Sequence, residues 1–149
     1  RVGITGCTNA CFSPYFLDFG ILGKYRTAAK AEGCTKCGVC VDYCSARAIT
    51  LGEQGPEFDR QACMMCAGCT EVCPEGVIYI QEKGYKVVAG GCGARLPHIA
   101  DTIAECTDAA GVLKILENAV RLLKETPTSG RFISLREVLE TKGVDALKA

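Results

Sequence analysis

Cysteine is the residue type in this chain with the most evident chemistry. The 149 residues include 12 cysteines, and such a fraction indicates either a disulfide-bonded secreted protein or a metal protein. Eight of them form two runs that share the spacing C-x2-C-x2-C-x3-C and begin 29 residues apart. The first run is Cys34, Cys37, Cys40 and Cys44, and the second is Cys63, Cys66, Cys69 and Cys73. A spacing that occurs twice favours one kind of metal group bound twice over a disulfide framework.

This spacing is the one by which bacterial ferredoxins bind 4Fe–4S clusters. Three thiolates two residues apart can reach one cluster if the backbone curls tightly, and Gly38 and Gly68 permit a close approach. The fourth cysteine of each run leaves on a helical turn and binds the partner cluster. We therefore expect two clusters with exchanged fourth ligands. The Cys40 site comprises Cys34, Cys37, Cys40 and Cys73, and the Cys69 site comprises Cys44, Cys63, Cys66 and Cys69.

Zinc and disulfide bonds are the two alternatives. Zinc sites normally take four ligands in two pairs rather than from one run of four cysteines, so both alternatives are disfavoured. The first run has Ser45 where proline usually follows, whereas the second has Pro74. This departure removes no ligand.

The segments that position the cysteines predict a small β-rich module over residues 30–82. Short strands are expected at 48–51 and 56–59 around a turn, and a matching strand at 76–80. The core of so short a module would consist largely of the clusters themselves.

The C-terminal part of the chain predicts helices. Asp108 is a suitable N-cap for a helix over 109–125, and Ser134 for a helix over 135–141. A further helix is expected over 97–105, with Cys106 at its end.

Composition and charge exclude several classes of function. The 17 basic residues balance 17 acidic ones, so the chain lacks the basic excess that attracts nucleic acids. No apolar run approaches the roughly 20 residues that span a bilayer. Because iron–sulfur clusters require reducing or low-oxygen conditions, we expect a cytoplasmic protein.

The flanks of the module resemble sirohaem-dependent nitrite and sulfite reductases. The stretch GCTNACFSPYFLDFGILGK at 6–24 is similar to a cluster motif of that family, which a strand ending in Asp-x-Gly-x-x-Gly follows. Residues 84–97 resemble the next strand of the family and its glycine–arginine loop. A ferredoxin insertion between these two segments is typical of dissimilatory and anaerobic sulfite reductases.

The resemblance implies an α+β fold and a role for each matching residue. Residues 1–29 and 83–149 would form an incomplete half of the 4Fe–4S domain that binds sirohaem, with the module at 30–82 inserted. Cys7 and Cys11 would bind a third cluster, and Cys11 would bridge it to the sirohaem iron. Contacts to sirohaem are implied for Asn9, Gly90, Gly91 and Arg95.

The family supplies the other ligands of the third cluster from a C-x5-C motif upstream of Cys7, which these 149 residues lack. We therefore expect a C-terminal fragment that binds two clusters and is inactive alone. The parent would reduce sulfite or nitrite with electrons from an external donor protein or subunit. The alternative is a non-catalytic electron-transfer module that docks to a redox partner.

Overall fold

The chain forms a mixed α+β structure with two compact units. The computed structural model describes residues 1–127, 130 and 133–148. One unit, here called the sheet unit, comprises residues 1–6, 10–23 and 84–149, and the other, the cysteine unit, comprises 7–9 and 24–83. The inserted module was expected over 30–82, so the cysteine unit extends that range at both ends. It also includes residues 7–9 of the cysteine motif at 6–11, here called the head motif. Within the described residues, no helix is long and apolar enough to cross a membrane.

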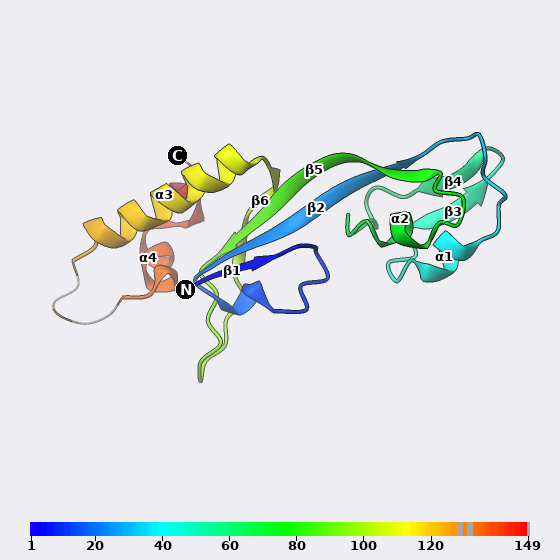
Figure 1. Cartoon of the computed structure of the whole chain (residues 1–149). Helices are drawn as coiled ribbons and strands as arrows, with labels where there is room; N and C mark the ends of the chain where they lie inside the picture. The colour runs from blue at the N-terminus through cyan, green and yellow to red at the C-terminus, as the bar shows by residue number, and fades with distance from the viewer. Residues whose placement is uncertain (128–129, 131–132, 149) are drawn as a thin grey trace. The chain divides into compact units, whose positions relative to one another are not determined.

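A four-stranded sheet has the order β1-β2-β5-β6 (Figure 1). Strand β1 is parallel to β2, with Val2 opposite Phe19, and β5 is antiparallel to β6. A short 3₁₀ helix, η1, lies between β1 and β2. The bounds are β1 Val2–Thr5, η1 Pro14–Phe16, β2 Phe19–Ala29, β5 Ile78–Ala89 and β6 Asp101–Thr107.

The two predicted C-terminal helices of the sheet unit are confirmed. Helix α3 spans Ala109–Glu125, and the Asp108 carboxylate accepts a hydrogen bond of 2.8 Å from the backbone N–H of Gly111. Helix α4 spans Leu135–Lys142 and begins after Ser134, whose hydroxyl accepts from the N–H of Glu137. A last 3₁₀ helix, η2, covers Val144–Leu147. Both caps satisfy backbone N–H groups that lack a partner in the first turn.

Apolar side chains from the sheet and the helices form the core of the sheet unit. Strands β2, β5 and β6 contribute together with α3, α4 and η2, and the buried Asn118 amide donates to the carbonyl of Leu147. The buried members are Phe19, Ile21, Val87, Ala89, Ile103, Val112, Ile115, Ala119, Leu122, Leu135, Val138, Leu139 and Leu147.

The predicted helix over 97–105 is wrong, because most of this segment is strand β6. Ile99 and Ile103 have the spacing of one helical face, but Ile99 is 64% exposed whereas Ile103 is 5% exposed. Pairing with β5 therefore decides the conformation, and strand propensity depends strongly on such neighbours. Strand β2 begins at Phe19 and continues beyond the Asp-x-Gly-x-x-Gly stretch to Ala29, and its first five residues are buried.

The cysteine unit contains a hairpin and two short helices. Strands β3 (Ile49–Gly52) and β4 (Gly55–Phe58) pair antiparallel, within one residue of the predicted strands. Helices α1 (Val39–Tyr43) and α2 (Gly68–Val72) contact each other. Partly buried cysteines pack against the small buried apolar cluster of this unit. The buried members of the cluster are Cys40, Ile49, Val77 and Ile78.

Candidate metal centre

Each run of cysteines begins in a loop with an unusual backbone. Lys36 and Gly38 have positive φ values of 55° and 82°, and Met65 and Ala67 repeat them at 59° and 62°. Non-glycine residues rarely adopt this region, and its cost is accepted mainly at functional sites. The two loops thus share one curled conformation, as the repeated spacing predicts.

The repeat places Ala67, not Gly68, in the position that corresponds to Gly38. Gly68 begins helix α2, and a Cβ atom there would lie 2.7 Å from Cε1 of Tyr43. Its small size therefore makes room for an aromatic ring of the cysteine unit. This packing explains Gly68 without a direct approach to a metal group.

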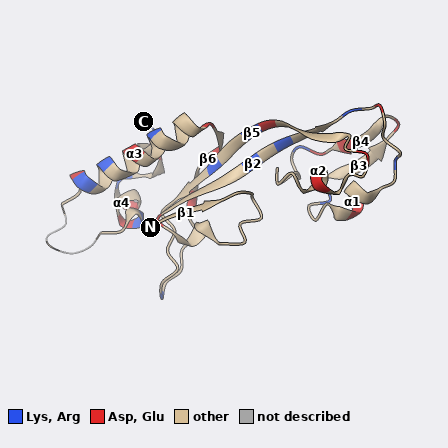
Figure 2. Cartoon of the chain, viewed as in Figure 1, with Lys and Arg blue, Asp and Glu red and all other residues tan. Residues whose placement is uncertain are grey.

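The last two cysteines of each run lie in a short helix and directly after it. Cys40 lies in α1 and Cys44 directly after it, and Cys69 and Cys73 occupy the corresponding places at α2. Each helix also carries one acidic residue at the equivalent position of the repeat: Asp42 in α1 and Glu71 in α2 (Figure 2). The two halves of the cysteine unit therefore match in ligands, in helices and in nearby negative charge.

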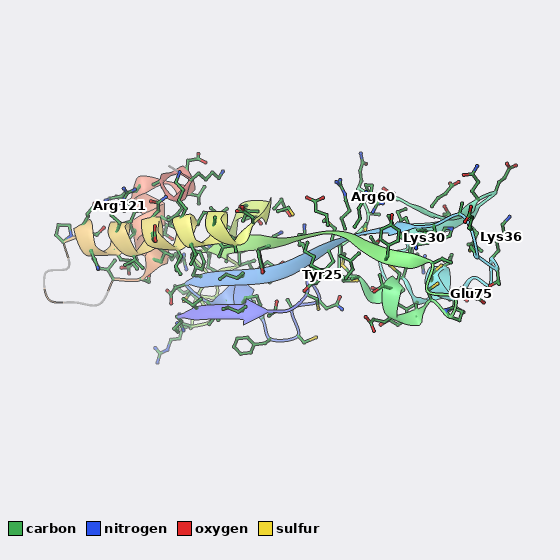
Figure 3. All side chains as sticks on the ribbon, turned by 45° about the horizontal axis from the view of Figure 1, so that its top comes forward. Tyr25, Lys30, Lys36, Arg60, Glu75 and Arg121 are labelled. Atoms are coloured by element: carbon green, nitrogen blue, oxygen red, sulfur yellow. The ribbon has the colours of Figure 1, made fainter. Side chains whose placement is uncertain are left out.

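The structure brings the cysteines together in the two predicted groups. A cavity of about 230 Å³ is lined by all four cysteines of the Cys69 site, together with Thr27 and Phe58. A second cavity, of about 20 Å³, is lined by all four cysteines of the Cys40 site. Lys36 and Glu75 also line the second cavity, and both side chains are exposed (Figure 3).

The donor sets fit iron–sulfur clusters. Each cavity is lined by four thiols, and soft thiolates are the ligands that such clusters take. Within the described residues, no group of three or more His, Cys, Asp or Glu side chains is arranged around a single metal ion. A cluster does not need that arrangement, because each of its cysteines binds a different iron atom. The smaller cavity has room for about one water molecule, so its thiols would have to separate around a cluster.

Burial and backbone N–H groups act on the thiols in opposite directions. Burial raises the pKa of Cys40 and of Cys69 above the ordinary value. At Cys73, burial also raises the pKa, but the backbone N–H groups of residues 75–78 outweigh it, so the pKa is lowered. The N–H groups of Ala48 and Met65 point at the sulfurs of Cys44 and Cys63, at 3.4 Å each. Such donors stabilise the thiolate form that binds metal.

Part of the head motif lies in the cysteine unit, against the Cys69 site. The Thr8 hydroxyl donates to the carbonyl of Met64 at 2.8 Å, and Asn9 lines the cavity of that site. Cys7 is half-buried in the same unit, whereas Cys11 belongs to the sheet unit and is exposed. The head motif is therefore divided between the two units.

Close packing and backbone conformation explain Gly90 and Gly91 in the glycine–arginine loop. A Cβ atom on Gly91 would collide with the carbonyl oxygens of Tyr15 and Leu17, and Gly90 has a positive φ of 83°. Backbone hydrogen bonds join Cys92 to His98 and close the loop, which leaves Arg95 exposed near its tip. Gly90 and Gly91 thus permit close packing within the sheet unit, and Arg95 is accessible to a ligand.

The sequence gives no signal for Thr27, which lines the larger cavity. Thr27 is 42 residues from Cys69 and lies outside both cysteine runs. Only the path of strand β2 brings it to the site. No spacing rule could have identified it.

Comparison with known proteins agrees with this geometry. A family model described as "4Fe-4S dicluster domain" matches residues 33–77. The chain is 44% identical over 91 residues to a coenzyme F420-dependent sulfite reductase of Methanocaldococcus jannaschii, a match that covers 61% of the chain and 15% of that protein. It is 39% identical over 46 residues to a subunit of the anaerobic sulfite reductase of Salmonella typhimurium, covering 31% and 14%. The chain is related to sulfite reductases and carries a ferredoxin-type dicluster domain.

A solved structure supports the fold over a longer range. The crystal structure of dissimilatory sulfite reductase I aligns with a TM-score of 0.67 at 16% identity, over 99% of this chain and 42% of the other. This likeness shows the fold, and the two relatives and the dicluster family model confirm the predicted resemblance to sulfite reductases with a ferredoxin domain. The chain spans less than a fifth of the length of each of these curated relatives. The dicluster domain supports an iron–sulfur electron-transfer role.

Proposed function

We propose that this chain is the electron-relay part of a sulfite reductase. The observation that carries the proposal is the grouping of eight cysteines around two cavities in the predicted combinations. When bound at the two sites, 4Fe–4S clusters would store and transfer single electrons. The relatives whose names specify sulfite favour that substrate over nitrite for the parent protein.

The contribution of the polypeptide is to bind and insulate the two clusters. The eight cysteines would hold them, and the N–H groups near Cys44, Cys63 and Cys73 would stabilise the coordinated sulfurs. The contact between Thr8 and Met64 ties the head motif to the Cys69 site. We therefore infer that the Cys69 site is the one that communicates with the catalytic centre.

The catalytic centre of the parent would be a sirohaem coupled to a third cluster. As the resemblance implies, Cys7 and Cys11 would supply two ligands of that cluster, and Cys11 would also bind the sirohaem iron. The resemblance also implies contacts to sirohaem from Asn9, Gly90, Gly91 and Arg95, of which Gly90 and Gly91 are buried by the packing described above. The exposure of Cys11 and Arg95 is compatible with these roles. An external protein or subunit would donate the electrons, in the cytoplasm.

The proposal is tested by anaerobic reconstitution of the 149-residue chain with iron and sulfide. We expect about eight iron and eight sulfide atoms per chain, two clusters of four, and no sulfite reduction by the chain alone. A chain that binds zinc instead, or no more than four iron atoms, would contradict the proposal. The optical spectrum of the longer parent protein, purified without oxygen, would reveal sirohaem directly.

A further inference from the structure

Thr27 is a buried hydroxyl residue beside one of the two cluster sites. Its side chain is 2% exposed, and it lines the cavity of the Cys69 site. Valine has nearly the same shape and suits a buried strand equally well. Because a buried hydroxyl is costly unless it has a hydrogen-bond partner, threonine at this position calls for a polar role.

Strand β2 is fixed against the second cysteine loop, so the position of Thr27 is well defined. The backbone N–H of Tyr25, a residue labelled in Figure 3, donates to the carbonyl of Met65 at 2.8 Å, and Tyr25 forms a parallel bridge with Cys66. Thr27 lies two residues further along the same strand, so its side chain is on the same side of the backbone as that of Tyr25.

The polar partner of Thr27 is a predicted cluster ligand. The Cys69 thiol donates a hydrogen bond to the Thr27 hydroxyl, with 3.8 Å between Sγ and Oγ1. A sulfur that coordinates iron has no proton to donate. The same pair can then persist only if the Thr27 hydroxyl donates to the Cys69 thiolate.

The equivalent cysteine of the other site is more deeply buried: Cys40 is 8% exposed, whereas Cys69 is only partly buried against the same apolar cluster. Cys40 occupies the place in the first run that Cys69 occupies in the second, and it lies in an apolar cluster with Val77 and Ile78. Asp42 and Glu71 are matched between the halves, so this negative charge does not distinguish the sites. Thr27 does distinguish them.

We propose that Thr27 is a positioning residue that raises the reduction potential of the cluster at the Cys69 site through a hydrogen bond to the Cys69 thiolate. A donor to a coordinating sulfur withdraws electron density and stabilises the reduced cluster, which carries the greater negative charge. The inference rests on the proposed function, because it requires clusters at both sites. Its consequence is that the hydrogen bond shifts electrons toward the site that contacts the head motif, relative to the same site without the hydroxyl.

The test compares the reconstituted wild-type chain with the Thr27→Val variant, which removes the hydroxyl and preserves the shape. Thr70→Val is the matched control, because the Thr70 hydroxyl donates to the carbonyl of Ala67 rather than to a sulfur. Thr27→Ser restores the hydroxyl, and Thr27→Ala is a second variant without it. Midpoint potentials are measured by redox titration with electron paramagnetic resonance detection.

We expect T27V and T27A to lower one of two midpoint potentials and leave the other unchanged, while T27S and T70V resemble the wild type. Unchanged potentials in T27V with full iron content overturn the inference and leave the proposed function intact. A T27V chain that binds only four iron atoms also overturns it, since Thr27 would then hold the cluster rather than set its potential. Failure of the wild type to bind two clusters overturns the proposed function itself.

Discussion

The sheet unit and the cysteine unit differ in what forms their cores. In the described residues, the main core of the sheet unit contains thirteen buried apolar residues from strands and helices, whereas the core cluster of the cysteine unit contains four, one of them Cys40. Burial of apolar surface is the dominant favourable contribution to folding. The sheet unit therefore has its own source of stability, and we expect the cysteine unit to depend on metal binding, as in other small metal-binding domains.

Removal of iron should have the largest effect and should affect the two units unequally. After chelation under anaerobic conditions, we expect α1, α2 and the β3–β4 hairpin to lose protection in hydrogen-exchange mass spectrometry, because their ligand-mediated connections are lost. Helix α3 in the sheet unit is the internal control and should keep its protection. Equal protection of α1 with and without iron would show that the cysteine unit folds without metal.

Loss of a single ligand should affect one site. We expect Cys40→Ala to reduce the iron content from about eight to about four atoms per chain, because the Cys40 site then has three ligands. Cys106→Ala is the matched control, since Cys106 is exposed on β6. Iron and sulfide assays after desalting measure the difference. Full iron content in Cys40→Ala would remove Cys40 from the ligand set.

A cavity in the sheet unit should destabilise that unit without loss of iron. Leu147 is fully buried, and Leu147→Ala should lower the free energy of unfolding of the sheet unit by about 2–5 kcal/mol. Leu113→Ala, on the exposed side of α3, should change it by less than about 0.5 kcal/mol. Denaturant titrations followed by circular dichroism test this. A parallel loss of iron in Leu147→Ala would mean that the two units are not independent in stability.

The smallest effect is expected at a helix cap of the sheet unit. Asp108→Ala removes the carboxylate that accepts from Gly111 at the start of α3, at a cost of about 1 kcal/mol. Asp108→Asn keeps an acceptor and should cost less. Both are measured as shifts in the denaturant midpoint at constant iron content. Equal destabilisation by the two variants would attribute the effect to charge rather than to the hydrogen bond.

Local signals in the sequence predicted the parts of the fold that depend on short-range interactions. The caps at Asp108 and Ser134 and the apolar spacing after each cap placed both helices correctly. The expected turn between 48–51 and 56–59 placed the hairpin. The segment 97–105 failed, because Ile99 and Ile103 fit a helix as well as a strand. Only the pairing of β6 with β5 decides between the two, and that pairing is a long-range contact.

The sequence predicted those residues of the candidate site that belong to the repeated cysteine spacing. The exchanged grouping of Cys44 and Cys73 followed from the pattern, and the two cavities contain those groups. Thr27 could not be found, because a strand from outside the pattern brings it to Cys69. The need for glycine at position 91 could not be predicted either, because the carbonyl oxygens of Tyr15 and Leu17 that it packs against are far from it in the sequence.

The order of strands in the sheet has a consequence for the ancestry of the chain. Strands β2 and β5 are neighbours in the sheet, although residues 30–77 separate them in the sequence. A simple turn could join two such neighbours, so the intervening segment is dispensable for the topology of the sheet. A gene segment that encodes a dicluster domain could thus be gained, lost or exchanged at this connection without a change in strand order.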